Sequence, residues 1–123
     1  MKISASLMRR FILFLCFIVS INLIAQNVPP SISDPEELRA TQIERQKVFD
    51  SIIEDPTNLE NLFNYATLSI LVGDLEAAIG VFEQMLIYKP DLPRIKLELG
   101  VLYFRLGANA SAKRYLDDVG NYD

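Results

Sequence analysis

Histidine is absent from the 123-residue sequence, and Cys16 is the only cysteine. A Cys–His or Ser–His nucleophile pair therefore cannot be assembled, and a transition metal would find carboxylate ligands alone. The five glycines are scattered along the chain, so the sequence offers no glycine-rich loop to hold a phosphate. We expect no enzyme activity, no metal site and no cofactor.

Basic residues are also scarce once the N-terminus is set aside. Residues 26–123 contain nine Lys and Arg against sixteen Asp and Glu, a net charge of −7. Nucleic acids and anionic lipid surfaces are bound through clustered cations that neutralise phosphates, so we expect neither as a partner. Cys16 lies outside this segment, which consequently cannot form a disulfide and depends on packing for its stability.

The N-terminus has the order of segments found in secretory signal peptides. Lys2, Arg9 and Arg10 precede an uncharged apolar run at residues 11–25, and the polar, proline-containing stretch QNVPPS follows. This run is shorter than the roughly 20 residues that span a bilayer. We interpret residues 1–25 as a cleaved signal peptide and expect an exported protein of the periplasm or cell envelope. An uncleaved membrane anchor at residues 11–25 is the alternative.

A linker and a helix follow this segment. The proline pair in residues 26–33 opposes helix formation and predicts an extended connection. The stretch SDPEEL is typical of a helix start, with Ser33 or Asp34 as the cap and Pro35 in the first helical position. We therefore expect an N-terminal helix or half-repeat at residues 34–55.

One later stretch fits two patterns. Apolar residues alternate with polar ones from Ile95 to Val101, which is typical of a half-buried strand. Leu99, Leu102 and Leu106 recur instead at the spacing of an amphipathic helix. The stretch alone leaves both interpretations open.

An internal repeat with one fixed offset favours the helix. Residues of similar size and polarity recur at this offset, including Pro56 and Pro90, Gly73 and Gly107, Ala78 and Ala112, and Leu68 and Leu102. A period of about 34 residues, as in these pairs, is typical of stacked helical hairpins. We interpret Ile95 to Val101 as part of a helix that is apolar on more than one side.

The segment NLENLFNYATLSILVGDLEAAIGVFEQMLIYKP resembles a tetratricopeptide repeat (TPR). The family's pattern is carried in the first copy by Ala66, Gly73, Ala78, Phe82 and Pro90, and in the second by Gly100, Tyr103, Gly107, Ala112 and Leu116. Ser69, Met85 and Asn109 depart from it. The resemblance implies an all-α solenoid of about two repeats, at residues 59–92 and, incomplete, at 93–123, preceded by one N-terminal helix.

The resemblance also implies a groove on the concave side, lined by the first helix of each repeat. The matching positions are Glu60, Phe63, Thr67, Ile70 and Leu71 in the first copy and Arg94, Leu97, Val101, Phe104 and Arg105 in the second. Such a groove is apolar in the middle and is suited to a protein or peptide partner. Alternatively, neighbouring helices cover these residues as ordinary core. The Lys, Arg and Asn clamp for chaperone tails is missing from these positions.

Three finer expectations follow from the repeat pattern. Gly100 is expected where helices of adjacent hairpins approach closely, and Asp91 is expected to cap the second copy. The final helix, at about 110–119, is expected to offer its apolar residues to a further repeat, which predicts self-association through this helix.

For function, we expect an exported protein–protein interaction module or scaffold of the bacterial cell envelope. A weaker likeness, of the stretch KPDLPRIKLELGVLYFRLG, is to the periplasmic TPR segments of outer-membrane surface lipoprotein assembly modifiers. That likeness implies the front part of a larger outer-membrane protein. The alternative is a membrane-anchored or oligomeric structural scaffold without a separate ligand groove.

Overall fold

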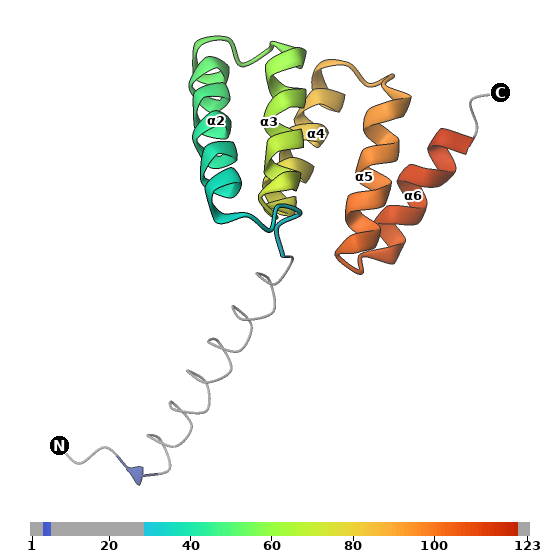
Figure 1. The fold of residues 1–123 in the computed structure, drawn as a ribbon. Helices are drawn as coiled ribbons and strands as arrows, with labels where there is room; N and C mark the ends of the chain where they lie inside the picture. Colours follow the sequence, from blue (N-terminus) through green and yellow to red (C-terminus); the bar gives the residue numbers. More distant parts are fainter. Residues whose placement is uncertain (1–3, 6–28, 121–123) are drawn as a thin grey trace.

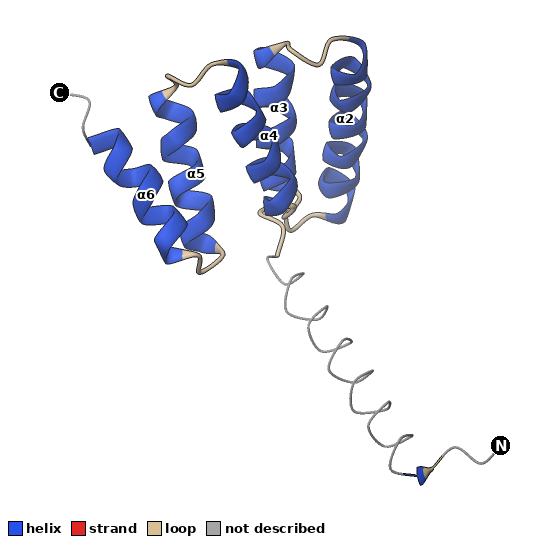
Figure 2. Ribbon diagram, turned by 180° about the vertical axis from the view of Figure 1, so that it is seen from behind, coloured by secondary structure: helices blue, strands red, loops and turns tan. Residues whose placement is uncertain are grey.

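The structure, a computed structural model, describes residues 4–5 and 29–120, and residues 29–120 form five helices joined by short turns (Figures 1 and 2). In chain order the helices are α2 (Pro35–Glu54), α3 (Leu59–Leu71), α4 (Leu75–Tyr88), α5 (Pro93–Arg105) and α6 (Asn109–Gly120). This part of the chain contains no strand, so the predicted all-α class is confirmed. The signal-peptide interpretation falls almost wholly outside the described residues. Of the helices that are described, none combines the length and hydropathy needed to cross a membrane.

The helices pack as two hairpins with one additional helix. α3 pairs with α4, α5 pairs with α6, and α4 joins the two hairpins by packing on α5 (Figure 1). α2 lies against the other side of α3. The result is the side-by-side arrangement of helices expected of a TPR-type solenoid.

Each hairpin turns at a glycine whose backbone is left-handed. Gly73 has a φ of 84° and Gly107 has a φ of 75°. Such angles are costly for residues with a Cβ, which explains why glycine recurs at the same place in both repeats. After the first turn, the Asp74 carboxylate accepts a hydrogen bond from the Ala77 amide at 3.2 Å and caps α4.

The core lies between α3, α4 and α5. Its fully or almost fully buried apolar residues are Leu62, Ala66, Leu75, Ala78, Ile79, Phe82, Met85, Ile95, Leu99 and Leu102. Alanine at positions 66 and 78 lets the two helices of the first hairpin approach closely. Most of the apolar surface removed from water therefore comes from the repeats and not from α2, which has no buried residue.

Rings and one arginine connect α2 to α3 and to the turn that follows α3. Its start is as predicted, since Asp34 accepts a hydrogen bond from the Glu36 amide and Pro35 is the first helical residue. The Phe49 and Tyr65 rings lie 5.6 Å apart. Arg45 donates to the Asp74 carboxylate at 2.8 Å, and also to the hydroxyl of the fully buried Ser69 at 3.5 Å. Ser69, a departure from the TPR pattern, thus gains a partner in α2.

The linker before α2 is tied to the far end of the first helix of the first hairpin. The Ser31 amide donates to the Leu71 carbonyl at 3.0 Å, so residues 29–33 run beside the C-terminal end of α3 (Figure 1). This carbonyl is one of those that a helix end leaves without an intrahelical partner.

Gly100 does lie at a close approach, but the prediction named the wrong neighbour. A Cβ built on Gly100 would come within 2.6 Å of Leu116 in α6, the other helix of the same hairpin. The reason is that Gly100 lies on the side of α5 that packs against α6, so Gly100 and Leu116 meet inside the second hairpin. The expectation of an interhairpin contact at Gly100 is therefore corrected.

The predicted cap of α5 is also wrong. The N-cap residue is Leu92, which makes no capping hydrogen bond through its side chain, and Asp91 lies one residue too early. Pro93 takes the first helical position, as expected, and fixes this register.

The apolar residues of α6 pack mainly on α5, and only Leu116 among the large ones is exposed. Ala112 is buried, the Tyr115 ring stacks on Tyr103, and Leu116 contacts Gly100 and keeps 38% of its surface exposed. The outer side of α6 is charged instead, with the ion pair Lys113–Asp117. Self-association through this helix stays a prediction, with the partly exposed Leu116 as the apolar group it would use.

Candidate functional site

α5 is apolar on two opposite sides. Ile95, Leu99 and Leu102 face the core and are almost fully buried. Leu97, Val101 and Phe104 lie on the other side, with 46%, 45% and 68% of their surface exposed. We call these three residues the α5 stripe. The alternation that resembles a strand therefore has a simple origin. Ile95 and Leu99 belong to the buried side of the helix, and Leu97 and Val101 belong to the exposed side.

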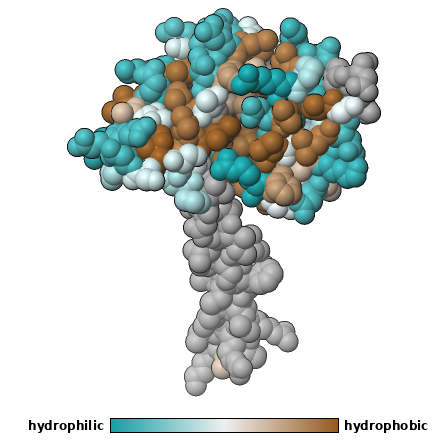
Figure 3. All heavy atoms as spheres, turned by 45° about the vertical axis from the view of Figure 1, so that its right-hand side comes forward, coloured by the Kyte–Doolittle hydropathy of each residue, from teal (hydrophilic) through white to brown (hydrophobic). Residues whose placement is uncertain are grey.

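The α5 stripe is a compact group of exposed apolar side chains, because its members follow the i, i+4, i+7 spacing of one helix side. α2 also exposes Ile43, Phe49 and Ile53, but their spacing turns Ile43 away from the other two. In Figure 3, which brings the α5 and α6 side of the molecule forward, apolar residues run across the middle of the visible face between hydrophilic margins. Contiguous exposed apolar surface is rare on monomeric proteins unless it binds something. The α5 stripe is therefore the first candidate for a functional site.

Two arginines lie at the ends of the α5 stripe. The Arg94 guanidinium lies over the Phe63 ring at 5.3 Å and pairs loosely with Glu98 at 4.0 Å. Arg105 is exposed in the last turn of α5, and no ion pair engages it within residues 29–120. One end of the stripe is thus a mixed cluster of charges, and the other end is a single unpaired cation.

An apolar hollow opens beside Arg94. It has a volume of about 370 Å³ and lies between the N-terminal turns of α3 and α5. Its lining consists of Leu59, Glu60, Phe63, Met85, Leu92, Pro93, Arg94 and Ile95. We call it the interhairpin pocket. Apart from Glu60 and Arg94, the residues that line it are apolar.

Most of the lining of this pocket was not predicted from the sequence. A usable signal existed, because Leu59 and Pro93 are one repeat apart and each begins the first helix of its repeat. Adjacent repeats place equivalent helix starts side by side. What could not be foreseen is that the space between them stays partly empty.

The residue before α5 does not cap its helix, although the equivalent residue before α3 does. Asn58 caps α3 by accepting a hydrogen bond from the Asn61 amide at 3.0 Å. The equivalent residue of the second repeat is Leu92, and leucine is among the poorest capping residues. Its half-buried side chain lines the interhairpin pocket instead. Departures of this kind concentrate at functional sites.

The predicted groove residues of the first repeat are more buried than those of the α5 stripe, except for Glu60 and Thr67. Phe63 and Ile70 are half-buried and pack against the core, with the Phe63 and Phe82 ring centroids 5.9 Å apart. Thr67 is exposed, and its hydroxyl donates to the Phe63 carbonyl at 2.9 Å. Leu71 is half-buried at the end of α3. The structure thus brings Phe63 and Glu60 to Arg94 at the pocket, while the open apolar surface belongs to the second repeat.

A comparison with known protein families agrees with this architecture. Residues 69–123 match a family described as the tetratricopeptide repeat. This match and the helical hairpins support the tetratricopeptide repeat family for this part of the chain. The match covers the end of α3 and all of α4 to α6, and so includes the α5 stripe. No curated protein and no solved structure matches the chain. TPR domains are in general interaction modules without catalytic activity, and they bind protein partners.

The second TPR hairpin is fastened to the first by a cluster that was not foreseen. The Tyr103 hydroxyl donates to the Glu83 carboxylate at 2.6 Å, and the Tyr115 hydroxyl donates to the same oxygen at 3.3 Å. The two rings stack with their centroids 5.8 Å apart. One carboxylate of α4 therefore holds both helices of the second hairpin.

The same cluster perturbs both phenols. The hydrogen bond to Glu83, burial and the negative charge of Glu83 raise the pKa of Tyr103 to about 12, from an ordinary 10.0. Burial and Glu83 also raise the pKa of Tyr115. Neither phenol is close to ionising at neutral pH, so the cluster is structural.

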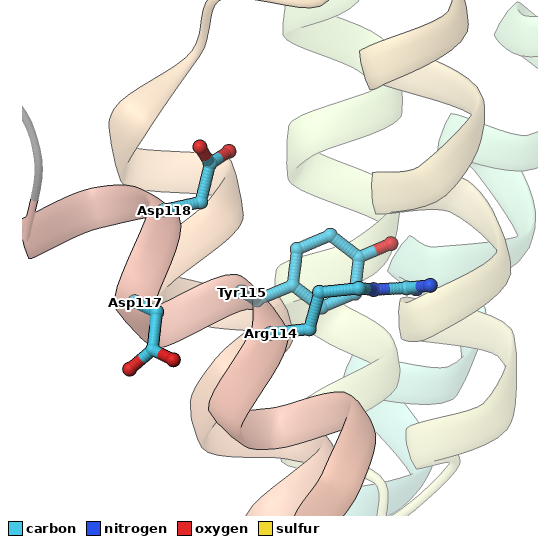
Figure 4. Close-up of a pocket in the computed structure, with 4 residues that line it drawn as sticks. All are labelled: Arg114, Tyr115, Asp117 and Asp118. Atoms are coloured by element: carbon cyan, nitrogen blue, oxygen red, sulfur yellow. The ribbon is translucent and has the colours of Figure 1, made fainter.

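A second hollow lies on the surface of α6, with a volume of about 450 Å³ (Figure 4). Arg114, Tyr115, Asp117 and Asp118 line it. Figure 4 shows the two carboxylates pointing in different directions, and lysines engage both, with Lys96 at 2.6 Å from Asp118. The residues described contain no cluster of carboxylate, His or Cys groups that could hold a metal. This part of the TPR surface has no arrangement suited to catalysis.

Proposed function

We propose that this TPR protein is an exported interaction module of the cell envelope that binds a protein partner through the α5 stripe. The observation that carries the proposal is the exposure of Leu97, Val101 and Phe104 on a helix whose other side is fully packed. Burying such side chains contributes roughly 25 cal/mol per Å² of apolar surface, which is the usual source of affinity at an interface. Arg94 and Arg105 supply the polar margin.

Site-specific photo-crosslinking in cells tests this binding site. A photoreactive residue in place of Phe104 should give a discrete adduct, and Leu97→Gln should abolish it because the apolar surface is interrupted. The matched control is the same photoreactive residue at Gly80, which is exposed on α4 and has open space around it. Equal labelling at both positions, or no adduct at Phe104, would contradict the proposal.

The exported location rests on the order of charged, apolar and polar segments at the N-terminus. Cell fractionation with intact-mass measurement tests it separately from binding. We expect a protein in the envelope fraction whose mass begins at Gln26. A mass that retains residues 1–25 in the membrane fraction would instead support the anchor at residues 11–25. Full-length protein in the cytosol would contradict export.

The absence of catalysis is part of the same proposal. A chain without histidine and with a single cysteine lacks the common nucleophile and base pairs. The weaker likeness to the periplasmic TPR segments of surface lipoprotein assembly modifiers supports a role as the front part of a larger outer-membrane protein. Sequencing the coding DNA downstream tests that point, because an open frame that continues into barrel-like strands would support it and an unrelated gene would contradict it.

A further inference from the structure

The α5 stripe and Arg94 have the same residue spacing when read in either direction along the helix. Arg94, Leu97, Val101 and Phe104 are spaced by three, four and three residues, which is the spacing of a coiled-coil seam. When two α5 helices cross in opposite directions about position 99, Leu97 of each faces Val101 of the other. The same register places Phe104 of each copy opposite Arg94 of the other copy.

Resting on the proposed function of the α5 stripe, we propose that its occupant is a second copy of this chain. The two copies form a two-fold symmetric dimer through antiparallel α5 helices. Phe104, which is 68% exposed, enters the interhairpin pocket of the other copy beside Arg94. An apolar ring and an apolar hollow on the same chain are thus both used, as a self-complementary interface requires.

The charges at the ends of the stripe fit this register. Position 105 of one copy lies opposite position 93 of the other, beside Glu60 of the pocket lining. Each end of the interface then contains Arg94, Glu60 and Glu98 from one copy and Arg105 from the other. Two positive and two negative groups balance at each end, and the unpaired Arg105 gains a carboxylate neighbour. Complementary charges at an interface margin favour one register over others.

A helix suits this surface better than an extended segment does. The α5 stripe offers apolar side chains and no amide or hydroxyl groups, so an extended strand would lose hydrogen bonds from its backbone to water. A helix satisfies those backbone groups internally. The opposing factor is the net charge of −7 on residues 26–123, whose repulsion is largely screened beyond about 8 Å at physiological salt.

Disulfide trapping tests the register directly. In a Cys16→Ser background, the full chain carrying Leu97→Cys is mixed with the chain carrying Val101→Cys and oxidised. Antiparallel packing about position 99 predicts a disulfide-linked pair in the mixture and much less in either variant alone, since position 97 meets position 101. A parallel pair would show the reverse. That reversal, or no trapped product in any sample, would overturn the proposed register.

A charge exchange tests the partner. Arg105→Glu and Glu60→Arg should each weaken dimerisation about tenfold by sedimentation equilibrium, because each places like charges at both ends. The double variant restores the opposite signs and should recover most of the affinity. An acidic partner of another kind would be weakened by Arg105→Glu and left unchanged or improved by Glu60→Arg. That pattern, or a strictly monomeric parent protein, would refute the proposal that a second copy of the chain occupies the α5 stripe.

The outcomes separate this inference from the proposed function. An adduct at Phe104 with the mass of two copies supports both. An adduct with a different protein, from a monomeric chain, leaves the proposed function standing and removes the second copy as occupant. The absence of any adduct that depends on Leu97 removes both.

Discussion

At the scale of single residues, Gly80 and Gly100 are two helical glycines in opposite packing environments. Both lie inside helices, Gly80 in α4 and Gly100 in α5. A Cβ at Gly80 would meet nothing within 4 Å, whereas a Cβ at Gly100 would lie 2.6 Å from both Cγ and Cδ2 of Leu116. Only the second glycine is required by packing.

We therefore expect Gly100→Ala to lower the free energy of unfolding, because moving Leu116 costs about 1–3 kcal/mol and the better helix propensity of alanine offsets only roughly 0.5–1 kcal/mol of it. Gly80→Ala, as the matched control, should raise the free energy of unfolding by roughly 0.5–1 kcal/mol, since glycine is a poor helix former. Urea denaturation measures both. Adding Leu116→Ala to Gly100→Ala should cost less than Leu116→Ala costs in the parent. Independent, additive effects of the two changes would contradict the contact.

The tyrosine pair under Glu83 gives a prediction with a defined pH dependence. A raised pKa in the folded state means that folding favours the neutral phenol, so the contribution to stability is complete below about pH 10. It is lost as the pH rises from there through about 12, the pKa of Tyr103 in the folded protein.

Ultraviolet titration of the phenolates should thus show Tyr103 and Tyr115 ionising above the ordinary phenol pKa of 10.0, close to alkaline unfolding. Glu83→Gln removes the negative charge and should lower the pKa of Tyr103 while shifting the last part of the titration to lower pH. An unchanged titration curve for Glu83→Gln would show that the carboxylate does not hold the two rings.

At the scale of the helices, α5 shows what a pattern of apolar residues can and cannot reveal. The alternation at 95–101 and the helical spacing are both real, because one helix has a buried and an exposed apolar side. The internal repeat was needed to decide between strand and helix. Which side remains exposed depends on the packing of α4 and α6, and the sequence of α5 does not contain that information.

The caps of α3 and α5 give a reciprocal prediction. Leu92→Asn should introduce at α5 the cap that Asn58 makes at α3, where Asn58 accepts a hydrogen bond from the Asn61 amide. Hydrogen exchange of the Ile95 amide should therefore slow. Asn58→Leu should speed exchange of the Asn61 amide and cost about 1 kcal/mol of stability. Both can be followed by NMR in the same samples.

Two results of the Leu92→Asn variant show whether Leu92 lines the interhairpin pocket at the expense of capping α5. If Leu92→Asn protects the Ile95 amide yet weakens dimerisation, the leucine serves the interhairpin pocket at the expense of the cap. If Ile95 exchange is unaffected by Leu92→Asn, the missing cap does not limit the stability of the first turn of α5, and Leu92 is not retained at the expense of a cap.

At the scale of the whole molecule, the TPR architecture was predictable and its exposed surface was only partly so. Turn glycines at 73 and 107, and small residues at 66 and 100 and at 78 and 112, repeat at one offset, which is enough to specify stacked hairpins. The side chains that close each hairpin were harder to assign. Leu116 and Tyr115 turned out to pack inward on α5, because the second hairpin buries its apolar residues between its own two helices.

The candidate site illustrates the same limit. Ten groove positions follow from the resemblance, but only those of the second repeat form an open apolar surface. α2 and α4 flank α3 and leave Phe63 and Ile70 half-buried, whereas the outer side of α5 has no neighbour among the described helices. Long-range packing of this kind is set by the number and order of helices around each repeat, so a local sequence pattern cannot supply it.

We propose that the α5 stripe is a binding surface and not part of the core. Equilibrium urea unfolding of the triple variant Leu97→Gln, Val101→Gln and Phe104→Gln tests it most directly, at concentrations where the parent is monomeric. Glutamine keeps a high helix propensity, so we predict a free energy of unfolding within about 1 kcal/mol of the parent. Leu99→Gln, on the buried side, should lose about 3–5 kcal/mol. A comparable loss in the triple variant would contradict the account, because it would place the stripe in the core.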